Sequence, residues 1–156
     1  MPQLPESVER FLQGKRFAVA GVSRSGDVAA NAVYKKLKNS GYEVYPVNPN
    51  ADEVEGDRCY PDIASIPAKI DGVVIGTNPK VSADIVRQSA EAGISRVWFH
   101  RSNGQGSISQ EAIDECGRLG IEPITGGCPL MFIEPVDVAH KCMRWWYQKK
   151  GVVPSP

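Results

Sequence analysis

The chain has 156 residues, of which 42% are hydrophobic and 23% are charged, and this length and composition predict one globular domain with a single packed core. Its 18 Lys and Arg residues balance 18 Asp and Glu residues, which excludes a broad basic field, so we expect no nucleic-acid partner. Four cysteines occur without a C-x-x-C pair, and this spacing supports neither a zinc site nor a redox dithiol.

The amino-terminal segment MPQLPESVERFLQGK lacks the long apolar run of a secretory signal, and no apolar run of the sequence is long enough to span a bilayer. We therefore expect a cytoplasmic protein with free thiols and no membrane partner. Within this segment, residues 7–12 are predicted to form a short helix because Val8, Phe11 and Leu12 fall on one side.

Short apolar runs then alternate with amphipathic segments, as expected for buried parallel strands connected by helices. In chain order, the expected elements are a strand at 17–22, a helix at 28–39, strands at 43–47 and 71–76, a helix at 79–92, a strand at 96–100, a helix ending at 119, a strand at 122–125 and a helix at 135–148. Ser107 or Ser109 is the expected cap of the helix that ends at 119.

Helical spacing predicts which side chains of these helices face the core. They are Ala29, Ala30, Val33 and Leu37 in the helix at 28–39, and Val81, Ile85, Val86 and Ala90 in the helix at 79–92. The connection 51–70 is expected to hold one short strand and one helical turn. We expect one domain over residues 1–150, followed by a disordered tail over residues 151–156.

The alternation of strands and helices predicts an α/β fold, a doubly wound, Rossmann-like parallel sheet of about five main strands. In such sheets ligands bind at the carboxyl ends of the strands. The loops that follow these ends are rich in Gly, Ser, Asn or Pro and cover residues 21–26, 48–51, 76–79, 99–106 and 125–130.

The first of these loops, GVSRSG, precedes a predicted helix and is typical of a phosphate site. For Gly21, making the turn and letting a ligand approach remain two open explanations. For Ser23 and Arg24, at a helix entrance, phosphate contact is favoured, because a guanidinium can donate two hydrogen bonds to one phosphate. Strand termination explains Pro49 but not Asn48.

The sequence does not favour NAD or NADP as the nucleotide. Their fingerprint is G-x-G-x-x-G, and Ser23 stands at its middle glycine. The acidic residue that holds the ribose hydroxyls is also missing, because Asn48 and Pro49 follow the second strand. The G-x-x-x-x-G-K-[ST] motif of P-loop proteins does not occur.

The ordered set VAGVSRSGD, YEVYPVNPN, EGDRCYPDIASIP, DGVVIGTNPK, RVWFH and PITGGCP resembles the small stand-alone CoA-binding proteins. Their domain is similar to the CoA-binding domain of the succinyl-CoA synthetase alpha subunit. The resemblance covers roughly residues 11–129 and implies coenzyme A or acyl-CoA as ligand. It implies that the phosphates lie at Gly21, Val22, Ser23 and Arg24 beside Asn31, that the adenosine lies at Val47, Asn48 and Pro49, and that Gly76, Thr77, Asn78 and Pro79 line the path of the ligand.

Catalytic candidates are few. His100, at a strand end, is a candidate base, phosphate ligand or polar rim residue. Cys128, in a loop at the ligand edge, is a candidate nucleophile or a candidate partner in a mixed disulfide with CoA. The simpler explanation is that Cys128 is a small buried residue. His140 is interpreted as a surface or packing residue of the last helix.

The remaining cysteines, Cys59, Cys116 and Cys142, are interpreted as core or near-core hydrophobes. Trp145 and Trp146 are adjacent, so one of them is a candidate for a subunit contact or a ligand edge, with internal packing an equal alternative.

The sequence thus predicts a non-catalytic CoA-binding carrier, sensor or regulatory module. The first alternative is an acyl-CoA-processing enzyme that uses His100 or Cys128, and the second is an NAD(P)-binding reductase. The expected partner is a small-molecule nucleotide ligand, with homo-oligomer formation left open.

Overall fold

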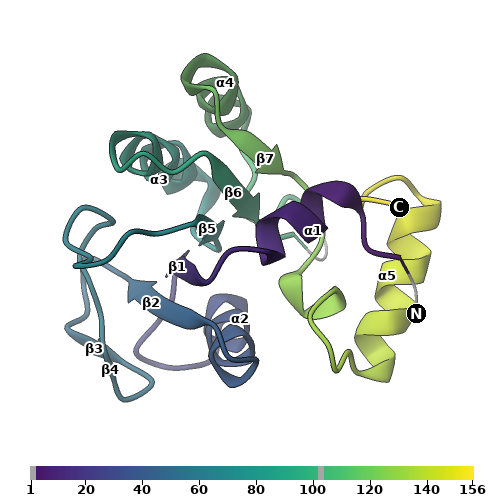
Figure 1. The fold of residues 1–156 in the computed structure, drawn as a ribbon, viewed down its shortest axis with the longest axis horizontal. Helices are drawn as coiled ribbons and strands as arrows, with labels where there is room; N and C mark the ends of the chain where they lie inside the picture. The colour runs from purple at the N-terminus through teal and green to yellow at the C-terminus, as the bar shows by residue number, and fades with distance from the viewer. Residues whose placement is uncertain (1–2, 102–103) are drawn as a thin grey trace.

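The computed structural model describes residues 3–101 and 104–156, and a five-stranded parallel sheet runs through its centre (Figure 1). The strands are β1 (Arg16–Ala20), β2 (Glu43–Val47), β5 (Gly72–Ile75), β6 (Arg96–Phe99) and β7 (Glu122–Ile124). Their order is β2-β1-β5-β6-β7, and every neighbouring pair is parallel. The predicted doubly wound, Rossmann-like sheet is therefore confirmed, with its topological switch between β1 and β5.

Helices cover both faces of the sheet (Figure 1). One face packs against α1 (Glu6–Leu12), α2 (Ala29–Asn39), the short 3-10 helix η1 (Pro129–Met131) and α5 (Val138–Lys149). The other packs against α3 (Pro79–Glu91) and α4 (Gln110–Leu119). Alternation along β1 shows the two layers, because Phe17 and Val19 join the first core and Ala18 and Ala20 join the second.

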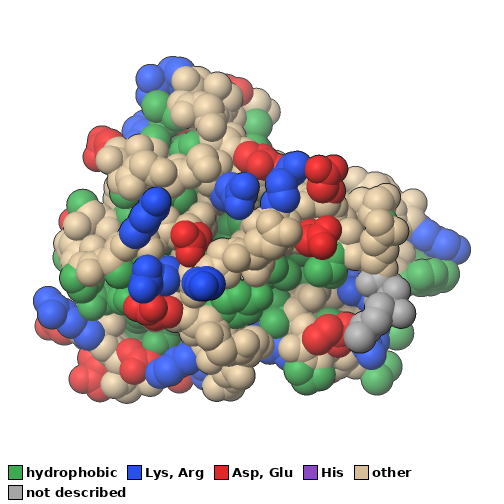
Figure 2. All heavy atoms as spheres, in the orientation of Figure 1, with side chains coloured by type: hydrophobic (Ala, Val, Ile, Leu, Met, Phe, Trp, Pro, Cys, Tyr) green, Lys and Arg blue, Asp and Glu red, His purple; other side chains and the backbone are tan. Residues whose placement is uncertain are grey.

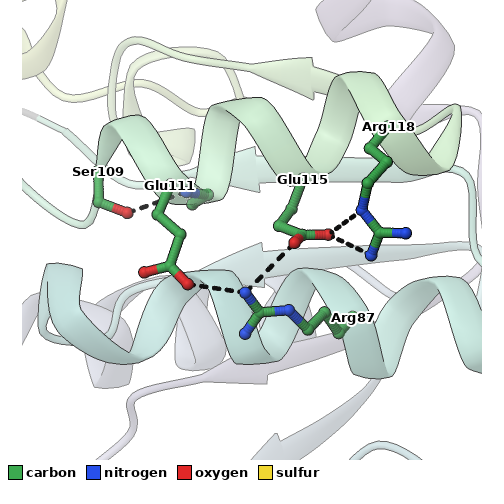
Figure 3. Close-up of polar contacts among 6 residues, drawn as sticks. Arg87, Ser109, Glu111, Glu115 and Arg118 are labelled. Carbon is green, nitrogen blue, oxygen red and sulfur yellow. Dashed lines mark hydrogen bonds and ion pairs between the residues drawn. The ribbon is translucent and has the colours of Figure 1, made fainter.

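Ion pairs on the outside hold α3 and α4 side by side (Figure 3). Arg87 on α3 donates to Glu111 at 2.7 Å and to Glu115 at 3.3 Å, and Arg118 donates to Glu115 at 3.0 and 2.6 Å. Ser109 is the cap of α4, and its hydroxyl accepts from the backbone N–H of Ala112 at 3.1 Å. These contacts fix the position of α3, one wall of the candidate site described below.

Between residues 51 and 70 the structure has two short strands where one was expected, and bends and turns where a helical turn was expected. The segment begins with an antiparallel hairpin of β3 (Glu53–Val54) and β4 (Asp57–Arg58) and continues through bends and turns. Glu55 and Gly56 form the hairpin turn with φ values of +53° and +78°. Positive φ at both central residues is characteristic of a type I′ turn, one of the two favoured two-residue hairpin turns.

Three side chains predicted to face the core are exposed instead. Ala29 is the first residue of α2 at the open edge of the sheet, Val81 lies in the first turn of α3 where a cavity begins, and Cys142 lies on the outward side of α5. α5 itself begins at Val138, three residues later than expected. The carboxy-terminal tail contributes Val153 to the core, which differs from the disordered tail expected from composition.

Candidate functional site

A cavity of about 800 Å³ lies at the carboxyl ends of β1, β2 and β5, next to the topological switch. Nine of the twelve residues predicted to contact the ligand line it. They are Gly21, Val22, Ser23, Val47, Asn48, Pro49, Gly76, Thr77 and Asn78. Arg24, Asn31 and Pro79 are not part of its lining. Three of the five predicted loops, at 21–26, 48–51 and 76–79, therefore converge although they lie far apart in sequence, whereas the loops at 99–106 and 125–130 contribute no described residue to the lining.

Close packing of the chain explains two of the glycines. Gly21 has a φ of +97°, and a Cβ there would lie 2.4 Å from the carbonyl oxygen of Gly76. A Cβ at Gly76 would lie 2.9 Å from the Cβ of Ala30 on α2. Of the two explanations left open for Gly21, the turn and the contact with the neighbouring strand end account for it without a ligand.

Asn31 fixes the first loop, residues 21–26, by hydrogen bonds to the backbone of Ser23. Its side chain is fully buried, accepts from the backbone N–H of Ser23 at 2.7 Å, and donates to the Ser23 carbonyl at 2.8 Å and to Glu55 Oε1 at 3.0 Å. A buried amide with all of these partners fixes the backbone around it. Asn31 therefore positions the loop rather than lining the cavity.

Asn48 links the second loop to the first. Its Nδ2 donates to the carbonyl of Val22 at 2.8 Å, and its Oδ1 accepts from the backbone N–H of Asn50 at 2.8 Å. The first bond ties the ends of β1 and β2 together across the cavity floor, and the second forms an Asx turn. This explains the asparagine that strand termination left unexplained.

The third loop leads directly into α3. Asn78 caps this helix by accepting from the backbone N–H of Lys80 at 3.0 Å, and Pro79 takes the first helical position. The Thr77 hydroxyl lies 2.8 Å from that of Ser82, whose hydroxyl in turn donates to the carbonyl of Ser107 at 2.6 Å. Ser107 is therefore a buried link between loops, and Ser109, not Ser107, is the cap of α4.

Sequence reasoning missed a whole wall of the cavity. The residues of this wall are Pro61, Asp62, Val81, Asp84, Ile85 and Gln88, and Val28 and Asn50 line the cavity outside it. Four of them, Val81, Asp84, Ile85 and Gln88, share one face of α3 at helical spacing, and this spacing directly after the third loop is the signal that could have found them. Gln88 closes the wall, because its Oε1 accepts from the backbone N–H of Ile63 at 3.1 Å.

The electrostatic character differs between the two sides of the cavity. Asp62 and Asp84 place carboxylates on the α3 side. On the opposite side α2 begins, with Val28 at its N-cap and no side chain bonded to its first N–H groups among the residues described. Such a helix start attracts anions. Arg24 is exposed in the loop that precedes α2 and is the guanidinium closest in sequence to this helix start.

The two catalytic candidates do not line the cavity. Cys128 is only 2% exposed, and burial raises the pKa of its thiol to about 11, so it is protonated at neutral pH. Burial, and to a smaller extent the charge of His140, lowers the pKa of His100. The backbone N–H of Arg101 donates to the Gly127 carbonyl at 3.1 Å, which joins the loops after β6 and β7.

Two classes of site are absent from the described part of the chain. Residues 3–101 and 104–156 contain no group of three or more His, Cys, Asp or Glu side chains placed to hold a metal ion. Over the same ranges, each helix is too short or too polar to cross a membrane.

Comparisons with known proteins identify the family of the chain. A family model described as a CoA binding domain matches residues 15–134. The chain is 29% identical over 139 residues to the Bacillus subtilis protein YneT, and the matched region covers 89% of this chain and 95% of YneT. It is 39% identical over 83 residues to the ADP-forming acetate–CoA ligase II of Archaeoglobus fulgidus.

That second match covers 51% of this chain and only 12% of the ligase, so the chain spans a small part of that enzyme. Among solved structures, a hypothetical protein from Pyrococcus horikoshii OT3 superposes with a TM-score of 0.71 at 31% identity, over 82% of this chain and 92% of that one. The family model covers well over half of the chain, and by this match the chain belongs to the CoA binding domain family.

Proposed function

We propose that the protein binds coenzyme A in the cavity between the ends of β1, β2 and β5 and α3, and that it acts as a non-catalytic carrier, sensor or regulatory module. The observation that carries this proposal is the convergence of three of the predicted loops, at 21–26, 48–51 and 76–79, on one cavity of about 800 Å³. This volume lies within the roughly 300–1,000 Å³ of small-molecule sites.

The residues present suit a nucleotide with phosphates on one side. The start of α2 offers backbone N–H groups, and exposed Arg24 offers a guanidinium, for the pyrophosphate and the 3′-phosphate of CoA. Val47, Pro49, Val81 and Ile85 offer apolar walls for a flat base. Asp62 and Asp84 would repel phosphate on the α3 side, so they favour one orientation of the ligand.

The catalytic alternative has less support. A nucleophilic thiolate needs a lowered pKa and access to the substrate. Cys128 has a raised pKa and is buried away from the cavity lining, and His100 also lies outside that lining. If the protein hydrolyses acyl-CoA and His100→Ala or Cys128→Ser abolishes that hydrolysis, the carrier assignment is wrong.

Calorimetric titration tests the ligand. We expect heat on addition of CoA, weaker binding of dephospho-CoA, which lacks the 3′-phosphate, and no comparable binding of NAD or NADP. Arg24→Ala should weaken CoA binding by about tenfold, as loss of a charge-assisted hydrogen bond implies. Arg16→Ala, which removes the same charge from the amino end of β1, at the edge of the sheet opposite the cavity, is the matched control and should leave the affinity unchanged. A folded sample that gives no heat with CoA or acetyl-CoA would overturn the proposal.

A further inference from the structure

The outward side of α5 carries an apolar stripe that the described residues leave uncovered. Val138 is 76% exposed, Trp145 57% and Trp146 51%, and Cys142 is exposed between them. Val138, Cys142 and Trp145 are spaced by three, four or seven residues, and Trp146 follows Cys142 by four, so all four share one side of the helix. Figure 2 shows hydrophobic side chains protruding beside Lys or Arg side chains at the edge of the molecule where Figure 1 places α5.

Basic side chains flank this stripe. The Lys149 ammonium lies 4.2 Å from the ring centre of Trp145, and that of Lys150 lies 4.7 Å from the ring centre of Trp146. Lys141 is exposed on the same helix, and residues 138–150 contain no Asp or Glu. The nearest acid, Asp137, is the N-cap of the helix and pairs with His140 at 2.6 Å.

The inner side of α5 packs against the rest of the protein. Met143 and Tyr147 pack against the core, and Arg144 donates to the Met131 carbonyl at 3.0 Å with its guanidinium over Phe132. The helix therefore stays attached to the fold without the outward tryptophans. It also lies beyond residues 15–134, the part matched by the family model, and none of its residues lines the ligand cavity.

We propose that α5 binds an anionic lipid surface, lying flat at the level of the headgroups. Twelve helical residues form a rod about 18 Å long. Half-exposed indoles next to lysines are the combination that suits a headgroup layer, because the rings enter the apolar boundary while the ammonium groups reach lipid phosphates. A second copy of α5 is a poor partner, because two helices with only basic charges would repel each other.

Vesicle flotation tests this proposal on the whole chain. We expect binding to vesicles of phosphatidylcholine with phosphatidylglycerol, no binding to phosphatidylcholine alone, and release at high salt. Tryptophan emission should shift to the blue on binding, because Trp145 and Trp146 leave water while Trp98 is already fully buried. The double variant Trp145→Ser with Trp146→Ser should lower the partition constant by about tenfold or more.

Charge reversal separates the basic contribution from the apolar one. Lys149→Glu with Lys150→Glu should lower partition into anionic vesicles by about tenfold or more. The matched control, Lys15→Glu with Lys69→Glu, makes the same charge change away from α5 and should stay within about twofold of the parent. Circular dichroism and urea unfolding check that each variant is folded.

Three results would each overturn the proposal. The first is absence of binding to anionic vesicles, and the second is equal binding to neutral and anionic ones. The third is a dimer in light scattering that the tryptophan variant dissociates, since this would make a second copy the occupant of the stripe.

Discussion

Replacing Asn31 tests whether the first loop is held by its buried amide. Asn31→Ala removes one hydrogen bond accepted from Ser23 and two donated to Ser23 and Glu55. It also leaves the N–H and the carbonyl of Ser23 without these partners. An unsatisfied buried group costs about 1–3 kcal/mol. Ser23 is half-buried and regains some water, so we expect the free energy of unfolding to fall by about 2–4 kcal/mol.

Urea unfolding measures this loss. With a slope of about 1.5 kcal/mol per molar urea, typical of small proteins, the midpoint should move down by about 2 M. The affinity for CoA should fall by about tenfold or more, because the loop that precedes the start of α2 is no longer fixed in the binding geometry. Saturating CoA should restore part of the lost stability through mass action.

Two further variants keep the test informative. Asn31→Asp retains the acceptor for the Ser23 N–H but turns a carboxylate toward the Ser23 carbonyl and Glu55, so it should destabilise the fold strongly at neutral pH. Adding Glu55→Gln should recover part of that loss, as a double-mutant cycle would show. If Asn31→Ala unfolds within about 0.5 kcal/mol of the parent, or binds CoA unchanged, the loop is not held by this side chain.

Three other perturbations follow from contacts in the structure. Gly21→Ala should destabilise the fold by about 3 kcal/mol or more, because the new Cβ would overlap the neighbouring backbone. Gly41→Ala, at a φ of +93° in open space, should lose only about 1–2 kcal/mol in the same urea assay, and equal losses would contradict the close approach at Gly21. Iodoacetamide at pH 8 should modify exposed Cys142 well before buried Cys128, whose pKa is raised to about 11, and peptide mass spectrometry showing the reverse order would contradict this burial. The backbone N–H groups of Lys15 and then of Arg16 lower the pKa of Asp71. Because Asp71 is exposed and water screens these contacts, Asp71→Asn should be less stable by no more than about 0.5–1 kcal/mol at neutral pH, and the difference should disappear as the pH falls below about 4 and through the lowered pKa. A constant difference down to pH 2 would contradict the assignment.

The strands and the site loops could be predicted because their signals are local. An apolar run such as residues 17–22 identifies a buried strand without knowledge of its neighbours, and a parallel sheet then brings all strand ends to one edge. The hairpin at Glu55 and Gly56 was missed because its strands have only two residues each. Such strands are too short to show an alternating pattern.

The α3 wall and the roles of the asparagines depend on tertiary contacts. Val81 was predicted to be buried because it is apolar and at helical spacing, but α3 is placed so that its first turn borders the cavity. Asn31 forms its bonds with a residue eight positions earlier and with one on a hairpin twenty-four positions later. No local pattern reports such distances, so only the resemblance drew attention to this residue.

The side chains of Asn31, Asn48 and Asn78 use most of their hydrogen-bonding groups on other parts of the protein. The Asn31 side chain forms hydrogen bonds with the backbone of Ser23, that of Asn48 donates to the Val22 carbonyl, and the Oδ1 of Asn78 caps α3. A ligand at this edge must therefore rely on backbone N–H groups, apolar walls and exposed Arg24 for much of its binding energy. Loss of affinity after substituting an asparagine would consequently not identify a ligand contact unless the stability of the free protein were unchanged. Arg24 and Val81 are the better probes, because both are exposed and neither supports another loop through a side-chain hydrogen bond among the described residues.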